Sequence, residues 1–159
     1  MFGFLKPNNL SPRLQRLKTQ QLFSTLTARE LTIVEGLLHM RKFLAGEIIF
    51  DEGEDGQALY ILFSGTVSIS RNYPTGREVL AELTSGSFFG DLALLDNTPR
   101  TAQIRAKDHC EMAVFFRADF MALLETDATI GYKISLQLAR NLAQRLRAQF
   151  IDKSRIETL

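Results

Sequence analysis

Short apolar runs cut by glycines fill the middle of this chain and restrict its fold more than any other feature. The runs have the length of β-strands and are rich in β-branched or aromatic residues; they occupy 47–50, 59–63, 66–70 and 79–83. The glycines that flank and separate them are Gly46, Gly53, Gly56, Gly65, Gly76, Gly86 and Gly90. Even spacing of such runs and turn residues predicts a barrel or jelly-roll-like β structure. A hairpin loop is expected at 72–76, and a last pair of strands at 102–105 and 111–116.

Two helices are predicted before this β region. The Ser-Pro pair at 11–12 has the residue types of a helix N-cap and first helical position, so we expect a helix from there to about Phe23. Thr27 and Glu30 form a capping-box pattern, because the threonine hydroxyl can accept a hydrogen bond from the Glu30 amide. This pattern predicts a second helix that ends near His39.

Helical spacing returns after the strands, with a short helix expected around 120–124 and a longer one from about Ala128 to Phe150. On the longer helix one apolar strip repeats every fourth residue, at Ile130, Ile134, Leu138, Leu142 and Leu146. A second strip contains Leu136, Ala139 and Ala143. Because two strips need two packing partners, we expect the β structure to cover one and a second copy of the chain to cover the other. The alternative is a helix that only lies across its own β structure.

The composition excludes several classes of protein. A net charge of +1 provides no long-range field to attract nucleic acid or a membrane surface. The lone cysteine, Cys110, lies in an alternating segment, so we expect a buried thiol and no internal disulfide. No apolar run approaches the length of a membrane span, and the first six residues lack the features of a signal peptide. We therefore expect a cytoplasmic protein.

The segment FGDLALLDNTPRTA, residues 89–102, carries the chemistry of a binding site. Gly90 permits a close backbone approach, and 91–95 can form one helical turn whose amide N–H groups point back toward the glycine and attract an anion. Arg100 can place its planar guanidinium on the same anion, and Thr101 adds a hydroxyl donor. The pattern predicts a small phosphorylated ligand. The alternative is an ordinary surface ion pair between Arg100 and a nearby aspartate, Asp91 or Asp96.

From about Leu22 to Leu146 the sequence resembles the cyclic-nucleotide-binding domain family. That family includes bacterial catabolite activator proteins, regulatory subunits of protein kinase A and cyclic-nucleotide-gated channels. Three motifs carry the resemblance: GEIIF with EG at 46–53, LYIL with a glycine at 59–65, and the cassette at 89–102. The resemblance implies a mainly β fold, an antiparallel β-roll with N-terminal helices and a long C-terminal helix. We expect an N-terminal arm and helix at 1–21 and the β-roll domain at 22–159, including C-terminal helices at about 117–156.

The resemblance also assigns roles to residues of the cassette. The groups expected to hold the cyclic phosphate are Arg100, Thr101 and the amides near Gly90, Leu92 and Ala93. Asp91 stands where the family usually has a glutamate that accepts a hydrogen bond from the ribose 2′-hydroxyl. Aspartate is one methylene shorter, which withdraws the carboxylate by about 1.5 Å and favours a water-bridged contact. Loss of a direct charged hydrogen bond costs roughly 1.5–3 kcal/mol, so binding is expected to be weakened but retained.

The resemblance places the long C-terminal helix over the purine base. Where bacterial activators have hydroxyl residues that contact adenine, this chain has Arg145 and Leu146. Arg145 can stack on the base or reach its edge; the alternative is a solvated arginine on the helix surface. Thr101 is compatible with cAMP and with cGMP, so both remain open as the ligand.

These observations predict a non-enzymatic cyclic-nucleotide sensor that signals through its C-terminal helices to a homodimer or to a downstream protein partner of unknown identity. His39 and His109 stand alone, so no catalytic or metal site is expected, and no cofactor besides the nucleotide. The chain stops at Leu159, directly after the long helix, so no helix-turn-helix domain for DNA is expected. The alternative is a degenerate domain that serves as a dimerisation or protein-interaction module without nucleotide response.

Overall fold

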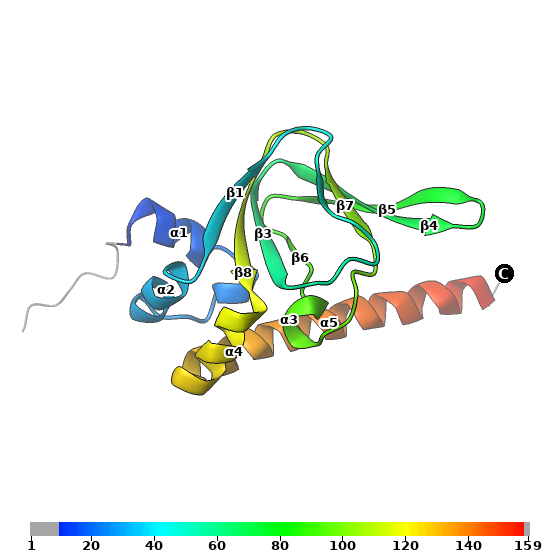
Figure 1. Cartoon of the computed structure of the whole chain (residues 1–159). Coiled ribbons are helices and arrows are strands. Elements are labelled where there is room, and N and C mark those ends of the chain that lie inside the picture. Colours follow the sequence, from blue (N-terminus) through cyan, green and yellow to red (C-terminus); the bar gives the residue numbers. More distant parts are fainter. Residues whose placement is uncertain (1–9, 158–159) are drawn as a thin grey trace, which may run out of the picture.

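The computed structural model describes residues 10–157, and over these residues the chain forms two four-stranded antiparallel sheets that close into a β-roll (Figure 1). The first sheet has the order β1-β8-β3-β6 and the second β2-β7-β4-β5. The strands are β1 (His39–Phe43), β2 (Ile48–Phe50), β3 (Ala58–Ser64), β4 (Thr66–Tyr73), β5 (Gly76–Thr84), β6 (Phe88–Phe89), β7 (Gln103–Ala106) and β8 (Cys110–Phe116). The sequence-predicted β-roll is confirmed, while the first nine residues of the expected N-terminal arm lie outside the described part.

The helices flank the roll (Figure 1). They are α1 (Pro12–Lys18), the 3-10 helix η1 (Gln21–Phe23), α2 (Ala28–Glu35), α3 (Leu92–Leu95), α4 (Arg117–Thr126) and α5 (Ala128–Glu157). Ser11 and Thr27 act as N-caps, as predicted, because their hydroxyls accept hydrogen bonds from the Leu14 and Glu30 amides. Among the described residues no helix combines the length and the apolar character that a membrane crossing requires.

Two predicted helix ends were wrong. The first helix does not continue to Phe23: it ends at Lys18 because the backbone of Gln20 turns to an extended conformation with ψ of 130° before η1. The second helix ends at Glu35 and not near His39. The residues His39–Phe43 instead form β1, which pairs along its length with β8. That pairing joins segments distant in sequence, and it overrides the local helical pattern.

The core has two parts, separated by the first sheet. Strand β3 is apolar on both faces because both faces are covered: Leu59 and Ile61 pack against the helices, whereas Leu62 packs inside the roll. The interior of the roll also contains the Cys110 thiol, which is fully buried, as expected from the sequence.

Helix α5 runs beneath the roll and then passes beyond it, with the β4–β5 hairpin projecting on the same side (Figure 1). In its first half Ile130, Ile134 and Leu138 are fully buried against the fold. In its second half Leu146 of the same strip, and Phe150 four residues further on, are 54% and 65% exposed. The long helix therefore covers the fold with only part of its apolar surface.

Candidate functional site

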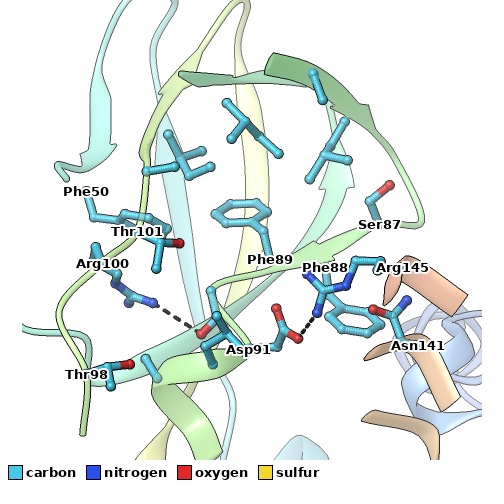
Figure 2. Close-up of a pocket in the computed structure, with 18 of the residues that line it drawn as sticks. Phe50, Ser87, Phe88, Phe89, Asp91, Thr98, Arg100, Thr101, Asn141 and Arg145 are labelled. Carbon is cyan, nitrogen blue, oxygen red and sulfur yellow. Dashed lines mark hydrogen bonds and ion pairs between the residues drawn. The ribbon is translucent and has the colours of Figure 1, made fainter. Parts of the chain in front are cut away.

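A pocket of about 480 Å³ opens between the second sheet, the segment around α3, and α5. This volume is in the range of sites that bind small ligands. The sequence-predicted residues Gly90, Asp91, Leu92, Ala93, Arg100, Thr101 and Arg145 all line it. The structure thus brings together, around one cavity, residues that come from the cassette and from the C-terminal helix (Figure 2).

The cassette turns at Gly90 and enters α3 at once. Gly90 has φ of +74°, in the left-handed region, and a Cβ there would lie 2.6 Å from Nη1 of Arg100. Asp91 occupies the N-cap position, and its carbonyl accepts from the Leu94 amide at 3.0 Å. The amides of Leu92 and Ala93 lie in the first turn, where N–H groups have no acceptor within the helix. The residues of this turn line the pocket, and a role of their amides in holding an anion stays a prediction.

Arg100 is held in place by the backbone and not by an acidic side chain. Its Nη2 donates to the Ala58 carbonyl at 2.8 Å and its Nη1 to the Gly90 carbonyl at 3.1 Å, while its Cζ lies 3.9 Å from the centre of the Phe50 ring. The side chain is buried, and burial lowers its pKa from the usual value. Among the described residues, no carboxylate forms an ion pair with Arg100. The structure therefore contains a buried cation without an anionic partner.

The alternative ion pairs of Arg100 with Asp91 or Asp96 are absent, and both aspartates have other partners. The Asp96 carboxylate accepts from the Thr98 hydroxyl at 2.6 Å. The Asp91 carboxylate forms an ion pair with Arg145, which reaches over from α5. Figure 2 shows Arg100 and Arg145 on opposite sides of the pocket, with Asp91 between them.

Gly56 is a component of the site that the sequence reading treated only as a turn residue. A Cβ at this position would lie 2.5 Å from the Ala93 Cβ and 3.2 Å from Nε of Arg100. The surrounding loop also holds the cassette through its backbone, since the Arg100 amide donates to the Glu54 carbonyl at 2.7 Å and the Gly53 amide donates to the Arg100 carbonyl at 2.8 Å. The loop that contains Gly53 and Gly56 thus contacts Arg100 directly and fixes its backbone. The even spacing of the glycines in the sequence does not reveal this contact.

The rest of the pocket is apolar on the sheet side and polar at the mouth. The apolar wall contains Ile69, Ala81, Leu83, Phe88, Phe89 and Ile104. Thr101 lies beside Arg100, and two polar side chains that the sequence reading missed, Ser87 and Asn141, lie near Arg145 (Figure 2). A cationic end next to an apolar end suits a ligand that has an anionic group attached to a flat hydrophobic ring.

Comparisons with known proteins agree with this geometry. The family model described as "Cyclic nucleotide-binding domain" matches residues 40–127. The Cyclic AMP receptor protein of Thermus thermophilus is 33% identical over 129 residues, which are 80% of this chain and 60% of that protein. The crystal structure of the Thermus thermophilus catabolite activator protein superposes with a TM-score of 0.77 at 32% identity, covering 87% of this chain and 63% of that one.

A eukaryotic structure shows the same similarity. The regulatory domain of Toxoplasma gondii PKA in its co-crystal structure with cAMP gives a TM-score of 0.63 at 31% identity, and the match covers 69% of this chain and 42% of that one. The chain spans 60% or less of the length of the first relatives that it matches, down to 16% for the cAMP-dependent protein kinase regulatory subunit of Mycosarcoma maydis. The similarity therefore concerns one domain of these longer proteins.

Proposed function

This chain belongs to the cyclic nucleotide-binding domain family, and we propose that it is a non-enzymatic sensor that binds cAMP or cGMP in the pocket between the second sheet and α5. Arg100 and the amides of the 90–93 turn hold the cyclic phosphate, with Thr101 as a further donor. The apolar sheet side receives the purine. Relatives named for cyclic AMP, among them the Thermus receptor protein and the co-crystallised regulatory domain, support this ligand class.

The observation that carries the proposal is the state of Arg100. Burying a guanidinium without a carboxylate partner is costly, because the charge loses its hydration and gains only neutral acceptors. Here the carbonyls of Ala58 and Gly90 orient the guanidinium, and the neighbouring turn supplies further N–H donors. A phosphate offers what this arrangement lacks, namely a negative charge with several acceptor oxygens.

Isothermal titration calorimetry with cAMP and cGMP tests this function. Wild type is expected to bind at least one of them, and Arg100→Ala to bind roughly 100-fold more weakly, because it removes a charged, forked donor. Arg41→Ala, an exposed arginine on β1 outside this pocket, is the matched control and should bind like wild type. Melting temperatures establish that each variant is folded. Folded wild type that gives no heat with either nucleotide would contradict the proposal.

We further propose that the ligand state is transmitted through α5 to a second copy of the chain. The helix has 30 residues, a length of about 45 Å. From its middle onward it carries apolar residues on one face, the half-buried Leu142 and the exposed Leu146 and Phe150. Two such helices side by side would bury this strip. Analytical ultracentrifugation should show a dimer for wild type and a monomer for L146K/F150K. Tyr132→Lys, at an equally exposed site of α5, should stay dimeric; dimeric L146K/F150K would contradict this interface.

One observation favours the second candidate function, a dimerisation module without nucleotide response. The carboxylate that the family resemblance assigns to the ribose is already paired with Arg145. If the chain is such a module, neither nucleotide raises its melting temperature, and it remains a dimer. The calorimetric titration separates the two functions, because only the sensor binds a nucleotide; the ultracentrifugation tests the dimer that both functions share.

A further inference from the structure

The ion pair between Asp91 and Arg145 joins two very different environments. The Asp91 side chain is buried, with 4% of its surface exposed, whereas the Arg145 side chain is 49% exposed. The Asp91 carboxylate forms no capping hydrogen bond to the amides of α3. Its ion-pair partner comes from 54 positions further along the chain, on α5. The pair therefore closes one side of the pocket with a charge contact between the cassette and the C-terminal helix (Figure 2).

This contact determines what a ligand hydroxyl encounters at Asp91. A hydroxyl that approaches a bare, buried carboxylate gains a charge-assisted hydrogen bond. A hydroxyl that approaches Asp91 in this structure meets a carboxylate that already accepts from a guanidinium, a donor with a full positive charge. The contact joins Nη2 of Arg145 to Oδ2 of Asp91. Because the guanidinium charge already stabilises the carboxylate, a further hydrogen bond from a neutral hydroxyl gains less there than it would at a bare carboxylate.

We propose that Arg145 is a specificity-determining residue, which occupies Asp91 and thereby makes the site insensitive to the 2′-hydroxyl of the ribose. The inference rests on the proposed function, since it concerns the sugar of the same cyclic nucleotide. It assigns to Arg145 a role that differs from a contact with the base: the arginine acts on the ligand through the carboxylate. Wild type then binds a cyclic nucleotide and its 2′-deoxy analogue with nearly equal affinity.

The test is calorimetric titration of the chain with 3′,5′-cAMP and with 2′-deoxy-3′,5′-cAMP. In Arg145→Ala the carboxylate is released, so the ribose ligand should bind about tenfold more tightly while the deoxy ligand is little affected. Adding Asp91→Ala to that variant should return the ratio of the two affinities to near one, because the acceptor is gone. Arg147→Ala, at an exposed arginine two residues further on α5, is the matched control and should keep the wild-type ratio. Melting temperatures report on folding.

Each result has a separate meaning. A ribose-to-deoxyribose ratio that rises in Arg145→Ala and falls again with Asp91→Ala supports the inference. An Arg145→Ala variant that weakens both ligands equally shows that Arg145 touches the phosphate or the base, and this overturns the inference while the proposed function stands. If wild type and both variants bind neither ligand, and wild type also gives no heat with cGMP, the proposed function itself is refuted, and the inference fails with it.

Discussion

The replacement of Gly56 by alanine tests whether the loop before β3 sets the position of the binding cassette. The added Cβ would lie 2.5 Å from the Ala93 Cβ and 3.2 Å from Nε of Arg100. Ordinary carbon–carbon contact begins at 3.4 Å, so α3 and the loop must separate by about 1 Å. The neighbours are a short side chain and a guanidinium fixed by two carbonyls, and neither has a free rotamer into which it can retreat.

The expected cost has two parts. Overpacking of this kind lowers the free energy of unfolding by about 1–3 kcal/mol, which for a domain of this size is a fall in melting temperature of roughly 2–12 °C. A displacement of about 1 Å also stretches a hydrogen bond of 2.9 Å beyond its useful range, and each charged bond to phosphate that is lost weakens binding by roughly 10- to 100-fold. The effect on affinity should thus exceed what the modest loss of stability suggests.

Calorimetric titration with cAMP measures the loss of affinity. When each protein is titrated at 20 °C below its own melting temperature, the loss of stability does not contribute to the result. The matched control is Gly36→Ala at the C-cap of α2, where the backbone has helical φ and the nearest atom to an added Cβ is 3.4 Å away. This control should bind like wild type. A folded Gly56→Ala protein with wild-type affinity would refute the reasoning, because the cassette would then not depend on its contact with Gly56.

Two further predictions concern stability and reactivity. Glu30 accepts from Lys133 Nζ at 2.7 and 2.9 Å, so Glu30→Gln should cost about 1 kcal/mol of unfolding free energy at neutral pH. Burial raises the pKa of Glu30, but the hydrogen bonds from Lys133 and Thr27 outweigh it and leave the pKa below 4.5. The difference between variant and wild type in urea unfolding should therefore persist above pH 4.5 and vanish as the pH falls through the lowered pKa; equal differences at all pH values would contradict it. Burial also raises the pKa of the Cys110 thiol, so iodoacetamide at about pH 8 should label it only after denaturation, and fast labelling of the folded protein would contradict this.

The strands of the roll were predictable where local pattern and burial coincide. The run at 59–63 is apolar and β-branched, and it became β3 because both of its faces are covered. Strand β1 escaped prediction because its residues are largely exposed, with the pattern of an ordinary surface segment. Its extended conformation comes from pairing with β8, in the register His39 with Val114. The residues of β1 contain no sequence signal for a partner so distant in the chain.

The candidate site also has a part that the sequence predicted and a part that it did not. The cassette was predictable because its glycine, its helical turn and its arginine are contiguous, and local geometry suffices to bring their donors to one point. Gly56 carried a visible signal, a glycine where no tight turn is needed, since the backbone there does not adopt positive φ. A glycine of that kind marks a close approach by another group. Which group approaches is a question of tertiary structure.

The choice between a ligand-binding Arg100 and a surface ion pair shows how one long-range contact decides a local question. Local chemistry offers Arg100 two acidic partners, Asp91 and Asp96, and no reason to prefer a ligand. In the fold, Asp91 is paired with Arg145 from α5, and Asp96 accepts from Thr98. What is left at the pocket is a guanidinium that the backbone orients and that no carboxylate of the described residues neutralises. The C-terminal helix therefore affects the charge of the cassette, because its Arg145 pairs with one of the two aspartates that local chemistry offers to Arg100.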